Sequence, residues 1–468
     1  MPIYRLHTAF LPQGWTQDAL VAVSAQGIIT AVDTYNPDEA PAQRTDPIEP
    51  VAGCVVPGMP NAHSHAFQRA MAGGAEYRSG GARDSFWSWR EAMYGLANRI
   101  RPDELQVVAT ELFIEMLKAG YTSVAEFHYL HRPAGDAPYA GANLLWEALS
   151  NAAGSAGIGL TFLPTLYQSS DFGGRPLRPE QARFSMSTDE FVRAIEARIG
   201  AERRAPPAIV RTGAAFHSLR AVPLEQLRRA AHALQSIDAA MPLHIHVAEQ
   251  MLEVRACERA SGRRPIELLL DQGLLTEHWC VVHATHATAA ELAGIAACNA
   301  AVCVSISTEA NLGDGFFDAA RFLKAGGRLC VGSDSQSSVD PCEELRWLEY
   351  QQRLRAKRRS VLADEAEPHV GTRLWRDAAQ NGARAIGQPV GRIAVGWRAD
   401  WLVLDPSHPA LAGAVPQSVL DRLLFAGADK AIRDVMVAGR WVIKDRRHAA
   451  DERSQADFAR VMRNLNPG

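Results

Sequence analysis

Eight short apolar segments alternate with longer segments of helical spacing through the middle of this 468-residue chain, and this alternation strongly constrains the fold. Residues 104–119, after Arg101-Pro102-Asp103, and residues 223–237 carry apolar side chains three and four positions apart, as amphipathic helices do. Eight strands that alternate with helices predict parallel β-α units closed into a TIM (β/α)8 barrel. The predicted strands end near His65, His128, Leu166, His217, Val247, His283, Ser305 and Asp334.

Both ends of the chain have a different pattern. Residues 1–57 hold short β-like pieces with no helical unit between them, and residues 391–450 resemble short strands broken by glycine and aspartate. We therefore expect a small β-sandwich domain built from both termini, a barrel over residues 58–390, and a C-terminal tail over 451–468. An insertion at about residues 72–98, rich in Gly, Arg and Trp, would lie over the catalytic face of the barrel as a lid.

The charge balance and the cysteines argue against several classes of function. The chain carries 49 Lys and Arg against 52 Asp and Glu, a formal net charge of −3, so a basic surface for nucleic acid is not expected. No apolar run approaches the roughly 20 residues that span a bilayer, and the first residues do not resemble a signal peptide. Seven scattered cysteines without a Cys-x-x-Cys pair indicate reduced core residues. We expect a cytoplasmic protein with neither membrane nor nucleic-acid partners.

Side chains at the ends of three predicted strands form the pattern of a metal site. His63 and His65 are two positions apart on one strand, so both imidazoles lie on the same side and reach one ion. In the fifth strand, His246 lies nearer the predicted catalytic face than His244, so we assign His246 as the third ligand. His244 is expected to be a buried, hydrogen-bonded neighbour. Asp334, at the end of the eighth strand, supplies a carboxylate oxygen.

Each of these signals has an ordinary structural alternative, because His-x-His pairs occur in metal-free strands and Ser-Asp-Ser segments are more often turns. Their joint occurrence at barrel strand ends favours a metal site. Three neutral imidazoles and one carboxylate suit Zn2+ best, with Fe2+ or Mn2+ as alternatives, and would acidify a water at an open position. Residues 160–167 and 209–216 contain no bridging carboxylate or lysine, so we expect a single metal ion.

Six motifs together carry a family resemblance. They are Pro57-Gly58, His63-x-His65, His246-x-x-Glu249, His283, Ser333-Asp334 and Gly391-x-Ile393-x-x-Gly396-x-x-Ala399-Asp400-x-x-Val403-x-Asp405. Over almost its whole length the chain resembles the amidohydrolase superfamily. Similarity to the mononuclear deaminase branch of that superfamily implies that zinc is held by His63, His65, His246 and Asp334.

The same resemblance implies that Glu249 and His283 handle protons. Hydrolysis at a carbon that bears nitrogen needs a base for the water and an acid for the leaving amine. Asp334 would take the proton from the water, Glu249 would protonate the imine nitrogen, and His283 would orient the water. A surface carboxylate at a helix start is the structural alternative for Glu249.

Side chains around the metal would set the specificity. Arg90 and Arg220 can each form a fork with a carboxylate, so they indicate an anionic substrate rather than a neutral purine, although a lid arginine is often solvated. Gln68 and Arg69, directly after the first two ligands, are further candidates, as are Tyr129 and His217 at later strand ends.

Three further segments look like those of the deiminases of histidine degradation within the superfamily. That resemblance implies an acyclic amidine with two carboxylates, N-formimidoyl-L-glutamate, with N-formyl-L-glutamate and ammonia as products, and it suggests a homodimer. Arg90, Tyr129, His217 and Arg220 would then hold the glutamate portion, with Gln68 near the formimidoyl group. The segments are Asp84-Ser85-Phe86-Trp87-Ser88-Trp89-Arg90-Glu91-x-Met93-Tyr94, Glu126-Phe127-His128-Tyr129-Leu130-His131 and His217-Ser218-Leu219-Arg220.

Two other functions use the same scaffold. A deaminase or chlorohydrolase of an aromatic heterocycle, such as guanine, a pterin or a triazine, would need the same metal ligands without the arginine forks. A non-catalytic barrel that serves assembly would be expected to have lost ligands. Retention of all four ligands together with Glu249 argues against this last alternative.

Overall fold

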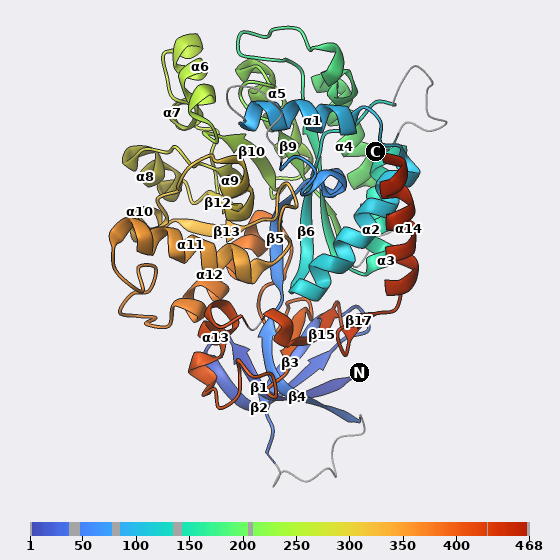
Figure 1. The fold of residues 1–468 in the computed structure, drawn as a ribbon, viewed down its shortest axis with the longest axis vertical. Helices are drawn as coiled ribbons and strands as arrows, with labels where there is room; N and C mark the ends of the chain where they lie inside the picture. Colours follow the sequence, from blue (N-terminus) through green and yellow to red (C-terminus); the bar gives the residue numbers. More distant parts are fainter. Residues whose placement is uncertain are drawn as a thin grey trace.

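The computed structural model describes residues 2–36, 47–76, 85–133, 143–204, 209–427 and 429–465. Figure 1 shows a barrel surrounded by helices and, beneath it, a sheet that contains the first strands of the chain. The last helix lies beside the barrel, so the two ends of the chain are on different parts of the molecule.

Parallel strands form the barrel that the alternating pattern predicts. They pair in the order β13-β12-β11-β10-β9-β7-β6-β5, β8 pairs with β7, and a parallel bridge between Ser64 and Asp334 joins the two edges. The TIM barrel is therefore confirmed, and each strand ends within three residues of its predicted position. The strands are β5 (Met59–Ser64), β6 (Tyr121–His128), β7 (Gly159–Leu166), β8 (Val210–Thr212), β9 (Ala214–Phe216), β10 (Leu243–Val247), β11 (Trp279–His283), β12 (Ala301–Val304) and β13 (Arg328–Val331).

The fourth predicted strand is divided into β8 and β9 at Gly213. A Cβ at this position would lie 2.7 Å from side-chain atoms of Leu163 and Pro242, so only glycine fits without displacing them. The apolar pattern of residues 209–216 predicts one strand because it does not reveal this close approach.

Helices cover the outside of the barrel. α2 (Pro102–Ala119) has proline at its first position and two acidic residues in its first turn, and it ends at Gly120, whose φ of 109° lies in the left-handed region. The second expected helix is α5 (Leu224–Ile237). The others are α3 (Leu144–Ala156), α4 (Thr188–Arg204), α6 (Met251–Ser261), α7 (Pro265–Asp271), α8 (Ala289–Ala297), α9 (Ile306–Leu312), α10 (Ala319–Lys324), α11 (Pro341–Ala356) and α12 (Val370–Ala385).

The predicted β-domain from both termini is confirmed as a continuous sheet in the order β17-β16-β15-β14-β4-β1-β2-β3. It has its own buried core, in which the rings of Tyr4 and Trp401 meet edge to face with centroids 5.4 Å apart. A short helix, α13 (Val419–Phe425), which the sequence pattern does not predict, interrupts this part. The strands are β1 (Ile3–Leu11), β2 (Gly14–Val23), β3 (Ile29–Thr34), β4 (Ile48–Pro57), β14 (Trp401–Leu404), β15 (Ile432–Val437), β16 (Arg440–Lys444) and β17 (Arg447–His448).

The segment expected as a C-terminal tail contains a helix, α14 (Asp451–Leu465), that lies along α2 (Figure 1). Val461 and Leu465 are each 3% exposed and belong to the core of the barrel. An ion pair of 2.5 Å between Lys118 and Asp451 fixes the start of the helix on α2.

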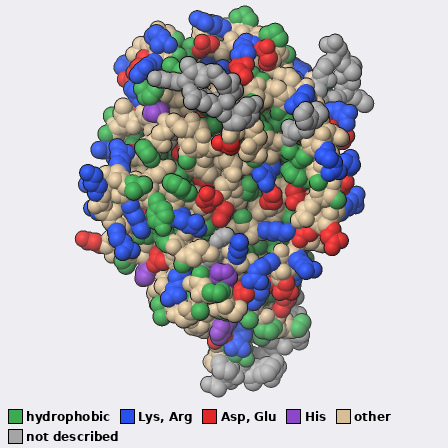
Figure 2. Space-filling model, viewed as in Figure 1, with side chains coloured by type: hydrophobic (Ala, Val, Ile, Leu, Met, Phe, Trp, Pro, Cys, Tyr) green, Lys and Arg blue, Asp and Glu red, His purple; other side chains and the backbone are tan. Residues whose placement is uncertain are grey.

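Charged side chains of both signs are interspersed over the face drawn in Figure 2. This distribution agrees with the small net charge of −3. Among the described residues, no helix is both long enough and apolar enough to cross a bilayer.

Candidate metal centre and active site

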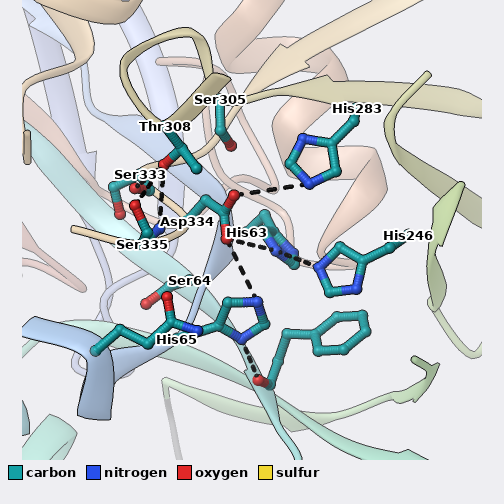
Figure 3. A network of polar contacts seen from close by, with 12 residues as sticks. His63, Ser64, His65, His246, His283, Ser305, Thr308, Ser333, Asp334 and Ser335 are labelled. Atoms are coloured by element: carbon teal, nitrogen blue, oxygen red, sulfur yellow. Dashed lines mark hydrogen bonds and ion pairs between the residues drawn. The ribbon is translucent and has the colours of Figure 1, made fainter. Parts of the chain in front are cut away.

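Four buried side chains meet where the edges of the barrel close. His63 and His65 come from the end of β5, His246 from β10, and Asp334 from the loop after β13, and their ligand atoms all lie within 4.8 Å of one another. Figure 3 shows the three imidazoles and the carboxylate directed toward one centre. The fold therefore brings together the four predicted ligands, and among the described residues they form a cluster that could hold a metal ion.

Hydrogen bonds to carbonyl groups fix the orientation of two of these imidazoles. Nδ1 of His65 lies 2.7 Å from the carbonyl oxygen of Phe127, and Nδ1 of His246 lies 2.9 Å from that of His217. A carbonyl oxygen only accepts, so both Nδ1 atoms carry a proton and both Nε2 atoms present a free lone pair to the centre. Burial and the neighbouring His63 lower the pKa of His65 to about 3, which keeps this imidazole neutral.

The distances between the ligand atoms match those around a small divalent ion. Ligand atoms placed tetrahedrally at about 2.0–2.1 Å from one ion are about 3.3 Å apart. Nε2 atoms of His63 and His65 lie 3.3 and 3.4 Å from Oδ1 of Asp334, and Nε2 atoms of His63 and His246 lie 3.0 Å apart. Burial opposes ionisation of Asp334, but the hydrogen bond and charge of His63 lower its pKa. The residues present therefore fit one divalent metal ion.

The second oxygen of Asp334 faces a different group. Oδ2 lies 3.7 Å from Nε2 of His283, and the same Nε2 lies 3.6 Å from Oε1 of Glu249. Burial raises the pKa of Glu249 to about 7, although His283 opposes this shift. Burial alone would lower the pKa of His283, but Glu249, Glu309 and Asp334 together raise it well above its usual value. Glu249 and His283, which can give and take protons, therefore lie beside the four candidate metal ligands.

A pocket above this cluster is covered by α1 (Phe86–Ala97), which lies across the top of the barrel in Figure 1. Arg178 forms a fork with both oxygens of Glu91 at 2.9 and 2.8 Å and ties α1 to the short helix η3 (Pro179–Phe184). α1 belongs to the insertion predicted as a lid, of which residues 77–84 lie outside the described part. Its pocket-lining residues are Phe86, Trp89, Arg90, Met93 and Tyr94.

Two arginines line the pocket, and some of their buried donors have no partner in the described part of the chain. Nε and Nη1 of both Arg90 and Arg220 are buried and make no hydrogen bond to a described residue. The guanidinium carbons lie 4.4 Å and 5.8 Å from the ring centre of Trp87. Burial and the charge of Arg220 lower the pKa of Arg90. Because buried guanidinium donors are almost always paired, this arrangement indicates an anionic ligand.

The remaining predicted substrate residues also line the pocket. Nε2 of Gln68 donates to the hydroxyl of Tyr129 at 2.9 Å, whereas its Oε1 is buried with no partner among the described residues. The ring of His217 lies between those of Tyr129 and Tyr167, with centroids 5.4 and 4.6 Å away. Gln68, Tyr129 and His217 are therefore placed to contact a molecule above the metal cluster.

Two other sequence candidates lie outside the pocket. Nε2 of His244 donates to the carbonyl oxygen of Ala385 at 2.8 Å, as expected for a buried neighbour of the ligands. Arg69 forms a fork with Glu115 at 2.8 and 2.9 Å on the outer side of the first ligand pair, so it does not contribute to the pocket.

Sequence patterns did not single out several residues around the site. Tyr167 and Glu253 line the pocket, and Glu253 accepts hydrogen bonds from the backbone N–H groups of Ala248 and Glu249 at 3.2 and 3.1 Å. Glu309 lies 3.3 Å from Nδ1 of His283. Glu309 lies four residues after the predicted strand end at Ser305, and Glu253 lies four residues after Glu249. This closeness to the strand ends is the signal that could have identified both glutamates.

The sequence matches the amidohydrolase family over residues 54–442, and the chain belongs to this family. Formimidoylglutamate deiminase of Pseudomonas aeruginosa is 48% identical over 459 residues, which cover 98% of each chain. The crystal structure of an amidohydrolase from Brucella melitensis is 37% identical, with a TM-score of 0.89 and coverage of 99% of this chain and 100% of that one.

A more distant solved structure has the same fold. An adenosine deaminase from Xanthomonas campestris with bound zinc is 21% identical, with a TM-score of 0.82 over 100% of this chain and 99% of that one. At this identity the likeness concerns the fold alone. The family membership implied by the six sequence motifs is confirmed by the match that spans most of the chain.

Proposed function

We propose that this protein hydrolyses the amidine of N-formimidoyl-L-glutamate to N-formyl-L-glutamate and ammonia, a reaction of L-histidine catabolism. In this reaction the oxygen of water forms a bond to the formimidoyl carbon, and the bond from that carbon to the terminal nitrogen breaks. The nitrogen leaves as ammonia. The similarity to the curated formimidoylglutamate deiminase extends over 98% of both chains and supports this assignment.

The buried, unpartnered donors of Arg90 and Arg220 are the single observation that carries the choice of substrate. Each arginine presents a planar fork that fits one carboxylate, and the substrate has two. The same pocket contains the carboxyl groups of Glu249 and Asp334, which can accept hydrogen bonds from the N–H groups of an amidine beside the four candidate metal ligands. A neutral heterocycle would leave the arginines unpaired.

We assign Zn2+ as the metal ion, with Fe2+ and Mn2+ as alternatives, because three imidazoles and one carboxylate form a ligand set of borderline hardness. His63, His65, His246 and Asp334 would hold it. When bound, the ion would acidify a water molecule and polarise the carbon–nitrogen bond of the amidine.

The protein's own groups would handle the protons. Oδ2 of Asp334 faces away from the ligand cluster and would accept the proton of the attacking water. Glu249, whose pKa burial raises to about 7, holds a proton near neutral pH and would donate it to the leaving nitrogen. His283 lies between the two carboxylates and would orient the water.

Substrate contacts follow from the pocket wall. Arg90 and Arg220 would bind the carboxylates, with Tyr129 and His217 beside the glutamate chain. The free Oε1 of Gln68 would accept a hydrogen bond from the formimidoyl N–H.

An ammonia-release assay tests this function. We expect purified zinc-loaded enzyme to release ammonia from N-formimidoyl-L-glutamate and to act poorly on guanine and N-formimidoyl-L-aspartate. Turnover confined to guanine would instead identify a heterocycle deaminase, and normal folding with no zinc and no turnover would identify a non-catalytic barrel.

The homodimer and the cytoplasmic location stay predictions. Light scattering of the purified protein would give a mass close to twice 50.9 kDa for a homodimer. Cell fractionation would test the location.

A further inference from the structure

Glu309 lies directly behind His283 and outside the wall of the pocket. Its side chain is fully buried on α9, and Oε1 lies 3.3 Å from Nδ1 of His283. The same oxygen accepts a hydrogen bond from the backbone N–H of Ser305 at 3.2 Å. Oε2 is buried and has no hydrogen-bond partner among the described residues. A buried carboxylate is costly to maintain unless a donor or a cation pairs with it, and His283 is the titratable group beside it.

His283 needs such support because its backbone is in an unfavourable conformation. The φ angles of His283 and Ala284 are 71° and 50°, both in the left-handed region that residues with a Cβ rarely adopt. This conformation turns Nε2 toward Glu249 and Asp334 at 3.6 and 3.7 Å. The opposite nitrogen, Nδ1, faces Glu309.

α9 also anchors the loop that carries Asp334. Oγ1 of Thr308 lies 2.9 Å from Oγ of Ser335 and accepts from the backbone N–H of Ser335 at 3.2 Å, as Figure 3 illustrates for the side-chain contact. Successive residues of one helix therefore contact the ends of β11 and β13.

We propose that Glu309 is a positioning residue for His283: it accepts a hydrogen bond from Nδ1–H and so directs Nε2 toward Asp334 and Glu249. The carboxylate fixes the ring orientation and keeps a proton on Nδ1. Glu309 does not reach the pocket, so it acts on the reaction only through His283. The catalytic consequence rests on the proposed function, whereas the hydrogen bond at Nδ1 does not.

Glu344 of α11 provides a matched control, because it contacts the same helix α9 through Ser307. It is also fully buried and accepts hydrogen bonds from the backbone N–H and the hydroxyl of Ser307, but it makes no described contact with His283. A purely structural role for Glu309 predicts that equal substitutions at the two positions have equal effects.

The test compares Glu309→Leu, Glu309→Gln, Glu344→Leu and Glu344→Gln in the zinc-loaded enzyme. We expect Glu309→Leu to lower kcat by about 10- to 100-fold, the range found for residues behind metal-ligating histidines, with an unchanged KM and full metal content. Glu309→Gln, which keeps an acceptor oxygen, should regain most of this loss. The Glu344 variants should change Tm but leave kcat within about threefold of the unmodified enzyme.

A second measurement does not depend on turnover. In 15N-histidine NMR of the zinc-loaded enzyme, the His283 resonances are identified by their loss in His283→Asn. The Nδ1–H of His283 should be hydrogen-bonded and shifted downfield in the unmodified enzyme, and Glu309→Leu should remove this downfield shift. If Glu309→Leu does not fold, Glu309→Asp replaces it, because the shorter side chain withdraws the carboxylate from Nδ1.

The positioning role would be overturned by an equal loss of kcat in both Leu variants or by a loss of kcat that follows loss of metal. An unchanged Nδ1–H resonance of His283 in Glu309→Leu would also overturn it. Failure of the unmodified enzyme to hydrolyse N-formimidoyl-L-glutamate would overturn the proposed function alone, since the NMR comparison still decides the role of Glu309.

Discussion

Nε2 of His63 lies 3.0 Å from Nε2 of His246, although these residues are separated by 183 positions in the chain. The ring of His246 is oriented by its hydrogen bond to the carbonyl of His217, so its lone pair faces His63. Close approach of ring nitrogens in a buried place, beside a carboxylate, is the arrangement expected around a shared cation.

Replacement of His246 should release the metal, whereas replacement of His244 two positions earlier should not. We expect His246→Ala to reduce the metal content from about one ion per chain to nearly none and to abolish turnover. His244→Ala removes a buried hydrogen bond to Ala385 and should cost about 1–3 kcal/mol of stability while metal is retained. Elemental analysis and thermal unfolding measure both effects, and the reverse result would exchange the two roles.

Glu249→Gln should stop turnover without loss of metal. The carboxyl group lies 3.6 Å from His283 and is not one of the four clustered ligands, so its amide analogue removes only the transferable proton. Loss of metal in this variant would refute the role of Glu249 as a proton carrier. His246→Ala serves as the metal-free reference.

Arg90→Met and Arg220→Met should each raise the KM for N-formimidoyl-L-glutamate. A hydrogen bond to a charged group contributes about 1.5–3 kcal/mol, which corresponds to roughly a 10- to 100-fold weaker interaction. Arg69→Met is the matched control, because Arg69 pairs with Glu115 outside the pocket. Initial-rate kinetics of the three variants measure the KM for N-formimidoyl-L-glutamate. Equal KM values would contradict the carboxylate-binding role of Arg90 and Arg220.

The rate should fall as the pH rises above about 7. Burial raises the pKa of Glu249 to about 7, and a proton donor is active only in its protonated form. The protonated fraction is high below this pH and decreases tenfold for each unit well above it. A profile of kcat/KM between pH 5.5 and 9 tests this, and a flat profile to pH 9 would show that another group supplies the proton.

The barrel and the metal ligands could be predicted because both depend on short-range patterns. Apolar segments define the strands, and parallel strands place their carboxyl ends on one face, so His65, His246 and Asp334 had to meet there. Asp334 lies three residues beyond the end of β13, yet its position after Gly332 was still informative. A Cβ on Gly332 would lie 2.7 Å from the carbonyl oxygen of His63, so glycine permits the close approach of the two loops.

Other features depend on contacts that no local pattern reveals. The break at Gly213 reflects packing against Pro242, 29 positions later in the chain. Glu309 belongs to a short helix, and its partner His283 is 26 residues away. The helix α14 was also missed, although a local signal was present: Phe458, Val461 and Leu465 lie three and four positions apart, as on one face of an amphipathic helix.

Asp334 divides its two oxygens between unlike neighbours, with Oδ1 toward His63 and His65 and Oδ2 toward His283. In the proposed reaction one side chain would therefore set both the affinity for the metal ion and the basicity of the group that accepts the proton of the water, so a replacement of Asp334 would change both. Independent tuning of the two would have to come from groups that shift the carboxylate without touching the ion, for example Ser335, the next residue in the chain, whose backbone N–H donates to Thr308.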